Sequence, residues 1–244
     1  MRDIAFLADM MGISLSDEQR KLFDIYERFL LEYNSIINLT RITDHEEIAL
    51  KHFADSIAIL PIVLKEADVQ GSDLMLADVG TGAGFPGMPL KIVMPSLDVT
   101  LIDSLKKRTG FLSQLNERLG ICGVKVIHAR AEDVGNTREL REKFNIVTAR
   151  AVAALPELCE YCLPLVRVGG VFAAMKAQAV EEINEAGYAI SKLGGIVEEV
   201  REYFLPGSDV FRTLVLIRKV KTTPAGFPRK AGKPSADPLK GGCK

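Results

Sequence analysis

The chain has 244 residues, of which 48% are hydrophobic and 26% charged, a composition typical of a soluble globular protein. This length suits one α/β domain with a modest extension. The formal net charge is −1, so overall charge indicates no partner, and nucleic-acid binding would need a local basic patch. Acids at Asp3 and Asp9 interrupt the first residues, so neither a signal peptide nor a membrane span is expected.

Residues 1–65 are predicted to form a helical extension that packs on the main domain. Ser16 is a candidate N-cap, and Gln19 follows three residues later, as in a capping box. Apolar side chains then recur at helical spacing at Leu22, Phe23, Tyr26, Phe29, Leu30 and Tyr33. The stretch NLTRIT (38–43) interrupts this pattern, and a second helix is expected from Asp44 to near Pro61.

Residues 66–221 are predicted to form a Rossmann-like α/β domain, because short apolar strands alternate with helices. The expected strands are 74–79, 98–103, 124–129, 144–149 and 170–175, with helices at 86–94, 104–119, 132–142, 154–166 and 178–193. Two final strands, 195–204 and 211–220, are joined by a turn so short that they must be antiparallel. The sequence therefore predicts a mostly parallel sheet that ends in an antiparallel hairpin.

The remaining residues, 222–244, are rich in Pro, Gly and Lys, and we expect an extended basic tail that is ordered only by docking. The chain has four cysteines: Cys122, Cys159, Cys162 and Cys243. The C-x-x-C pair lies on an expected helix, and no second pair completes a zinc site. We therefore expect buried thiols, no metal and a reducing cytoplasm.

The loop DVGTGAGFPG (78–87) follows a predicted strand and precedes a helix, where an open α/β sheet binds its ligand. A P-loop is excluded, because no lysine follows Gly87. A dinucleotide fingerprint is present at Gly82, Gly84 and Gly87, but Phe85 and Pro86 would crowd a pyrophosphate. The whole run has the form acid-x-G-x-G-x-G, which is the first motif of S-adenosylmethionine (SAM)-dependent methyltransferases.

Acidic residues beside this loop favour nucleoside binding. Asp78 ends its strand, where a carboxylate could meet a positively charged ligand, and the glycines let the backbone pass close under a nucleoside. Asp103 ends the next strand, where it could accept hydrogen bonds from both ribose hydroxyls. Ala131 and Glu132 follow the third strand and could flank the adenine, although Glu132 could equally serve a helix N-terminus. The terminal hairpin favours a methyltransferase over a dinucleotide enzyme.

Five segments together resemble the RsmG (GidB) family of bacterial methyltransferases, which modify N7 of a guanine in 16S ribosomal RNA. They are DVGTGAGFPGMPLKI (78–92), LIDSLKKRTGFL (101–112), ARAED (129–133), VTARAVA (147–153) and the upstream NLT…KHFADS (38–56). The resemblance covers roughly residues 15–240 and includes FPRKAGKPSADPL in the tail. One departure is Lys51, where the family commonly has Arg, so the charge is kept.

The resemblance implies a class I SAM-dependent methyltransferase fold with SAM as its cofactor. It implies that Gly80 and Phe85 line the SAM pocket and that Arg150 closes it after the fourth strand. The other implied or expected contacts are Asp78, Gly82, Gly84, Asp103, Ser104 and Leu105 on the loop and ribose side, and Ala131 and Glu132 on the adenine side.

No catalytic base is expected, because SAM carries an activated methyl group and guanine N7 has a free lone pair. Catalysis then requires alignment and exclusion of water. A hydrolase triad of His52, Asp55 and Ser56 is conceivable, but His52 and Asp55 share one helix and no G-x-S-x-G elbow exists. This segment is expected to cover the cofactor or to touch RNA.

A local basic surface is expected to bind RNA. Cations at a helix N-terminus oppose the helix dipole, so a phosphate contact would offset their cost, whereas a solvated face is the alternative. Phe85 or another aromatic residue near the loop could stack on a base. The predicted RNA-binding residues are Arg41, Lys51, Lys106, Lys107, Arg108, Arg229 and Lys230, with Lys233 nearby.

The sequence therefore favours a cytoplasmic, monomeric 16S ribosomal RNA (guanine-N7)-methyltransferase whose partner is the RNA or the small ribosomal subunit. Two alternatives remain open. One is an NAD(P)-dependent oxidoreductase that uses Gly82, Gly84 and Gly87. The other is a SAM-binding RNA chaperone without turnover.

Overall fold

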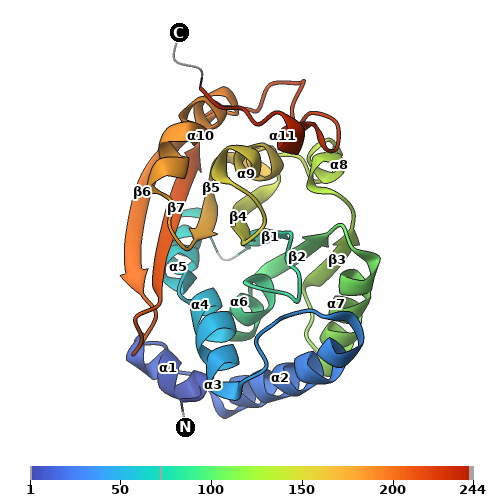
Figure 1. The fold of residues 1–244 in the computed structure, drawn as a ribbon, viewed down its shortest axis with the longest axis vertical. Coiled ribbons are helices and arrows are strands. Elements are labelled where there is room, and N and C mark those ends of the chain that lie inside the picture. The colour runs from blue at the N-terminus through green and yellow to red at the C-terminus, as the bar shows by residue number, and fades with distance from the viewer. Residues whose placement is uncertain (1, 72, 242–244) are drawn as a thin grey trace.

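A seven-stranded sheet in the order β3-β2-β1-β4-β5-β7-β6 forms the centre of the molecule in the computed structural model, which describes residues 2–71 and 73–241 (Figure 1). The first five strands are parallel, and β7 is antiparallel to both β5 and β6. This arrangement confirms the predicted fold. The strands are β1 Met75–Val79, β2 Asp98–Asp103, β3 Val124–His128, β4 Phe144–Arg150, β5 Val166–Lys176, β6 Gly195–Phe204 and β7 Phe211–Lys219.

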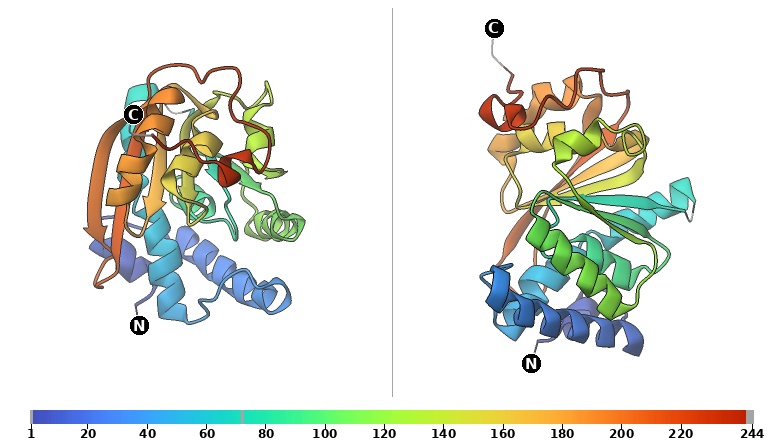
Figure 2. Two further views of the ribbon diagram at one scale, coloured as in Figure 1. Left: turned by 45° about the horizontal axis from the view of Figure 1, so that its top comes forward. Right: turned by 90° about the vertical axis from the view of Figure 1, so that its right-hand side faces the viewer.

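Helices cover both faces of the sheet, as expected for a parallel sheet, and Figure 2 shows the two layers from the side. One layer contains α8 (Ala131–Gly135), α9 (Leu155–Cys162) and α10 (Val180–Lys192), whose apolar residues pack in one core cluster. The other contains α6 (Gly87–Val93), α7 (Lys106–Leu119) and the N-terminal helices, which share a second cluster. No helix among the described residues has both the length and the apolar character needed to cross a bilayer.

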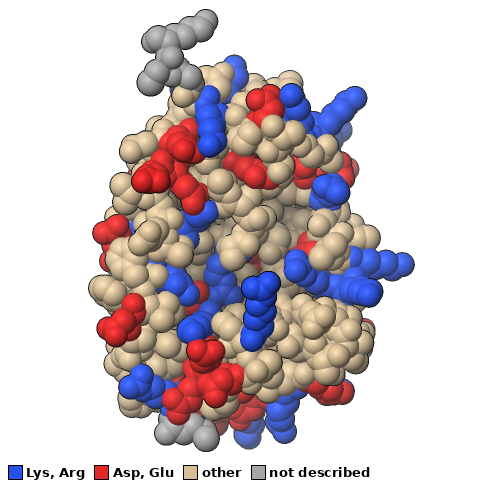
Figure 3. Space-filling model, in the orientation of Figure 1, with Lys and Arg blue, Asp and Glu red and all other residues tan. Residues whose placement is uncertain are grey.

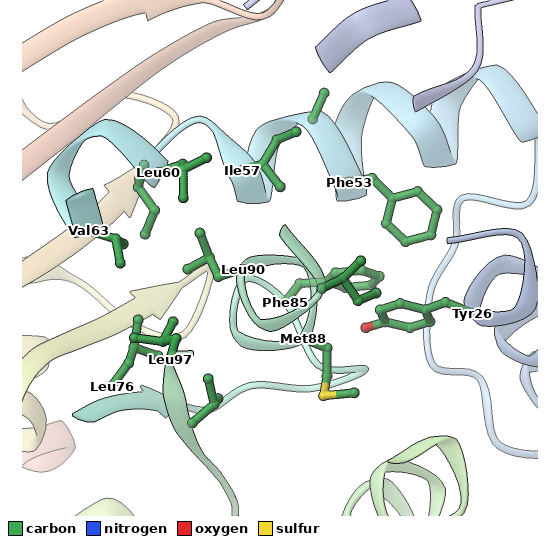
Figure 4. Packing of buried hydrophobic residues seen from close by; sticks show 14 of the residues in the cluster. Tyr26, Phe53, Ile57, Leu60, Val63, Leu76, Phe85, Met88, Leu90 and Leu97 are labelled. Carbon is green, nitrogen blue, oxygen red and sulfur yellow. The ribbon is translucent and has the colours of Figure 1, made fainter. Parts of the chain in front are cut away.

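The N-terminal extension comprises α1 (Ile4–Met10), α2 (Asp17–Ile37), α3 (His45–Ile48), the π-helix η1 (Ala49–Ala54), α4 (Asp55–Ile57) and α5 (Leu60–Gln70). The predicted capping box is confirmed, because Ser16 and Gln19 exchange side-chain and backbone hydrogen bonds at the start of α2. Figure 4 shows Tyr26 and Phe53 of this extension facing Phe85 and Met88. The extension and the sheet therefore share one hydrophobic core.

Three element boundaries differ from expectation. Pro61 is the second residue of α5 rather than the end of a helix, because proline is tolerated in a first helical turn. The expected boundary between residues 65 and 66 therefore falls within α5. Helix α8 ends at Gly135, well before residue 142, because Asn136 and Thr137 turn the chain. Strand β5 starts four residues before the predicted Gly170.

The cysteines of the C-x-x-C pair, Cys159 and Cys162, are buried on α9 with free thiols, as predicted. Cys243 lies outside the described residues. The described part of the tail, which includes α11 (Lys233–Ala236), docks against the layer of α8 and α9. Arg141 holds the tail, because its guanidinium donates to the carbonyls of Thr223 (2.8 Å) and Phe227 (2.6 Å). Docking thus orders the tail as expected.

Candidate active site

The side chain of Asp78 holds the glycine loop in place through hydrogen bonds. This carboxylate is fully buried and accepts hydrogen bonds from the Gly87 amide (2.9 Å) and from the hydroxyls of Thr81 (2.6 Å) and Thr148 (3.2 Å). Burial raises the pKa of Asp78 to about 6, although these donors favour the ionised form. In this structure the Asp78 side chain therefore shapes the loop, and its contact with a ligand stays a prediction.

Three glycines of the loop have a positive φ, and their surroundings differ. Gly80 has a φ of +67°, and a Cβ there would lie 2.6 Å from a methyl carbon of Val152. Gly84 has a φ of +100°, and a Cβ there would meet the Tyr26 hydroxyl at 2.6 Å. Gly82 has a φ of +61°, which favours glycine, but a Cβ there would have no neighbour within 4 Å. Gly84 therefore leaves room for the Tyr26 side chain in this structure, and its contact with a nucleoside stays a prediction.

A pocket of about 210 Å³, called here the first pocket, opens at the carboxyl ends of β1, β2 and β3. It brings together five of the predicted residues, from three separate connections: Gly80, Asp103, Ser104, Ala131 and Glu132. Leu105 does not line it and contributes only its backbone N–H, which donates to Asp103 (2.8 Å). The spacing of the strand ends therefore correctly predicted that these five residues lie close together at one edge of the sheet.

Asp103 is held in one orientation at the floor of the first pocket. Only 2% of its surface is exposed. Its Oδ2 accepts a hydrogen bond from the Gly82 amide (3.0 Å), while the guanidinium of Arg108 lies 3.4 Å from the same oxygen. Each carboxylate oxygen has more than one lone pair, so Asp103 could still accept hydrogen bonds from a vicinal diol.

Glu132 lies across the first pocket and is fixed by the tail. Its Oε1 accepts a hydrogen bond from the Gly232 amide (2.9 Å), so a residue one hundred positions later orients this side chain. The far wall also contains Val152, Glu157 and Tyr161, which sequence reasoning missed. Their signal was their place on the connection after β4 and on α9, directly beyond another carboxyl end of the sheet.

Phe85 is enclosed by aromatic rings and does not line the first pocket. Only 6% of its surface is exposed, and its ring stacks on Tyr26 (5.3 Å between centroids) and on His52 (4.6 Å). The guanidinium of Arg150 lies 5.1 Å from the centre of the Phe85 ring. The N-terminal extension therefore covers Phe85 in this structure, and its contact with SAM stays a prediction.

A second pocket of about 480 Å³ lies at the carboxyl ends of β4 and β5. Arg150 lines this pocket rather than closing the first one, which corrects its predicted position. Its Nη1 donates to Asp55 Oδ2 (3.0 Å) and to the Lys51 carbonyl (3.2 Å), while Arg212 Nε donates to Asp55 Oδ1 (3.0 Å). Asp55 is 2% exposed, so a buried carboxylate aligns two arginines along one wall.

The two pockets adjoin along residues 150–153. Val152 and Ala153 line the first pocket, and Arg150 and Ala151 line the second. Ala151 has a φ of +55°, a strained conformation for a residue with a Cβ, and it lets the chain turn sharply between the two spaces. Only this short segment separates the two hollows on one edge of the sheet.

The KHFADS segment holds no hydrolase triad. Asp55 is occupied by the two arginines, and the buried Ser56 donates to the His52 carbonyl rather than to its ring. Burial, with the nearby Arg150, lowers the pKa of His52 to about 4, so its ring is neutral at pH 7. Among residues 2–71 and 73–241, no cluster of His, Cys, Asp or Glu could hold a metal ion.

The predicted basic residues fall into separate groups. Lys106 and Lys107 are exposed at the start of α7, and Arg41 and Arg108 line a hollow beside the loop 38–40. Figure 3 shows basic side chains across the middle of the molecule, between acidic groups. Lys230 is also exposed.

Three predicted RNA contacts have partners within the chain. The Arg108 guanidinium lies 3.4 Å from Asp103 Oδ2. Lys51 pairs with Glu47 (2.6 Å) at a partly exposed site. Arg229 donates from Nε and Nη2 to the fully buried Glu160 (2.7–3.1 Å) and pairs with Asp237 (3.3 Å). In this structure the Arg229 guanidinium therefore anchors the tail to α9, and its role in RNA binding stays a prediction.

A protein-family model described as rRNA small subunit methyltransferase G matches residues 19–206. The chain belongs to this methyltransferase family. A protein of this name from Acetivibrio thermocellus is 50% identical over 232 residues, which cover 95% of this chain and 93% of the relative. Another from Lactobacillus delbrueckii subsp. bulgaricus is 52% identical over 229 residues, which cover 93% of this chain and 95% of the relative. The family suggested by the sequence motifs is thereby confirmed.

Solved structures of other methyltransferases share the fold. TrmK of M. capricolum, solved with S-adenosyl-homocysteine, has a TM-score of 0.50 at 14% identity and covers 67% of this chain and 70% of its own. A geranyl diphosphate methyltransferase solved with SAM has a TM-score of 0.51 at 14% identity and covers 67% of this chain and 85% of its own. The class I methyltransferase fold of this family member is thus confirmed.

Proposed function

We propose that the protein transfers a methyl group from SAM to N7 of a guanine in 16S ribosomal RNA. Membership of the small-subunit rRNA methyltransferase family supports the reaction and the RNA. The observation that carries the proposal is the pair of adjoining pockets, one lined by the predicted nucleoside-binding residues and one by cations. A group held in the first pocket would need to pass only residues 150–153 to reach the second.

SAM occupies the first pocket in this proposal. Asp103 accepts hydrogen bonds from the ribose hydroxyls, because its carboxylate is already oriented by the Gly82 and Leu105 amides. Ala131 and Glu132 flank the adenine, and Ser104 closes the ribose side. Gly80 marks the exit towards the second pocket, where Arg150 faces the methionine end.

The chain needs to orient rather than to activate its substrates. SAM supplies an electrophilic methyl group on a sulfonium, and guanine N7 has a lone pair and no proton to remove. The side chains around residues 150–153 therefore align the two reactants and exclude water. No general base is required among the described residues. The His52 ring is held by Thr40, and its lowered pKa of about 4 makes it a weak base.

The RNA approaches from the side of the 38–43 loop and the start of α7. Arg41, Arg108 and the exposed Lys106 and Lys107 lie on this side and contact phosphates. Lys51, which lines the second pocket, and the exposed Lys230 of the tail provide further cations for the RNA. Residues 1–65 and 222–244 then act as substrate-side and cofactor-side additions to the catalytic part, 66–221. We further propose a monomer that acts in the cytoplasm on the RNA or on the small ribosomal subunit.

The decisive experiment is methyl transfer from labelled SAM to small ribosomal subunits, followed by mass spectrometry of the 16S RNA. The expected result is one methylated guanine that carries the fixed positive charge of an N7 adduct. An oxidoreductase would instead bind NADH and leave the RNA unmodified, and a chaperone would bind SAM and RNA without transfer. Either of these results would overturn the proposal.

A further inference from the structure

Three nearly parallel rings form a column from the N-terminal extension to the second pocket. Tyr26 stacks on Phe85 with an interplanar angle of 10°, and Phe85 stacks on His52 with an angle of 13°. Tyr26 is fully buried and its hydroxyl donates to the Ala83 carbonyl, so that end of the column is closed.

The column ends in the second pocket at His52. Phe85 lies between its two neighbours and lines neither pocket. Among the described residues that line the second pocket, His52 supplies the single aromatic ring. A planar ligand that enters this pocket therefore meets one ring on which to stack.

We propose that the imidazole of His52 is the platform on which the acceptor guanine stacks in the second pocket. This inference rests on the proposed function, because it assumes that a guanine is the acceptor. It extends the existing column by one planar group. Stacking also suits the reaction, because a base held by its face keeps the N7 lone pair free, whereas a hydrogen-bond donor on N7 would block the transfer.

The position of the ring is fixed by two contacts. Nε2 of His52 lies 2.8 Å from Oγ1 of Thr40, and the Phe85 ring stacks on the imidazole. Burial and Arg150 keep the imidazole neutral. A neutral ring does not repel a product base that carries a positive charge.

The contacts of His52 suit two roles: stacking of its ring on the base, and holding Thr40 through a hydrogen bond. Two variants distinguish these roles. His52→Phe keeps a flat ring but loses the Thr40 hydrogen bond, whereas His52→Gln keeps a hydrogen-bonding group but has no ring. A stacking role predicts that His52→Phe retains the wild-type KM for small ribosomal subunits within a few fold. It predicts that His52→Gln raises this KM by about 5- to 150-fold, the range for loss of one base–aromatic stack, with SAM affinity unchanged.

The opposite pattern, a defective His52→Phe and a normal His52→Gln, would show that His52 serves only to hold Thr40. Equal behaviour of the two variants, whether both normal or both defective, would also overturn the inference, because the ring would then make no difference. His45→Phe is the matched control, since His45 pairs with Glu27 and lines neither pocket. Absence of methyl transfer by the wild-type protein would instead overturn the proposed function itself.

A direct reading of stacking is available because the chain contains no tryptophan. His52→Trp places a single indole at the end of the column, and stacking of a base on it should quench its fluorescence when small ribosomal subunits are added with S-adenosylhomocysteine. The control, His45→Trp, should show little quenching. Equal quenching of the two variants, or none, would overturn the inference.

Discussion

Replacement of Arg229 by Ala should destabilise the protein strongly rather than weaken RNA binding directly. The side chain donates three hydrogen bonds to Glu160, which is 0% exposed. Removal of one partner of such a buried pair costs about 3–5 kcal/mol, because an uncompensated charge remains. The Arg229 amide also donates to Glu160 (2.8 Å) and would survive the substitution, so we expect the lower end, about 3 kcal/mol.

The assay is urea unfolding followed by circular dichroism. Lys230→Ala is the matched control, because it removes an exposed cation from the neighbouring position and should cost less than about 0.5 kcal/mol. The double variant Glu160→Leu with Arg229→Met should recover only part of the loss, since apolar side chains can replace a buried ion pair but the Arg229 amide loses its acceptor. The reasoning would be refuted if Arg229→Ala had wild-type stability and bound ribosomal RNA more weakly than Lys230→Ala.

Three other predictions concern the cofactor, the RNA and pH. Asp103→Ala should weaken SAM binding by about 2–4 kcal/mol in calorimetry, because the two ribose hydroxyls lose a charged acceptor. If a 2′-deoxy analogue bound the wild-type protein as tightly as SAM, this role of Asp103 would be contradicted. Joint replacement of the exposed Lys106 and Lys107 by Ala should lower the slope of log K against log salt by roughly 1 for each lost phosphate contact. SAM affinity should stay nearly constant, because Arg108, which lies 3.4 Å from Asp103 Oδ2, is left in place. An unchanged slope would indicate a solvated helix face. Burial lowers the pKa of His52 to about 4 in the folded protein, whereas an unperturbed imidazole has a pKa of about 6.5. The stability that the neutral ring contributes is therefore complete above pH 6.5 and is lost as pH falls towards 4. Relative to His52→Phe, the wild type should lose about 3 kcal/mol of unfolding free energy over this range, and parallel pH profiles for the two proteins would disprove the shift.

Local sequence patterns determined the architecture and the first pocket. Alternation of apolar strands with helices fixed the parallel sheet, because each strand needs a covered face, and the short turn before Phe211 fixed the antiparallel end. Residues at successive carboxyl ends of parallel strands must meet at one edge. This rule placed Gly80, Asp103 and Glu132 together although 52 positions separate the first from the last.

Contacts between distant segments decided the rest, and no local pattern contains them. Asp78 lies under the loop because Thr148 of the neighbouring strand and Gly87 of α6 donate to it. Phe85 is covered because an N-terminal helix brings Tyr26 onto its ring. In the sequence, Arg229 resembles a surface cation of a basic tail. In the fold, it contacts the carboxylate of Glu160, 69 positions earlier in the chain.

Side-chain partners across the molecule therefore determined which polar residues are free to bind a ligand. Sequence spacing specifies on which edge or face a residue lies, because backbone geometry is local and periodic. Sequence spacing does not specify whether a charged side chain on that face stays exposed. Burial of a charge is unfavourable unless a partner of opposite charge compensates it. For Arg229 and Asp55 that partner comes from a segment far away in the chain, so only the tertiary structure could assign their roles.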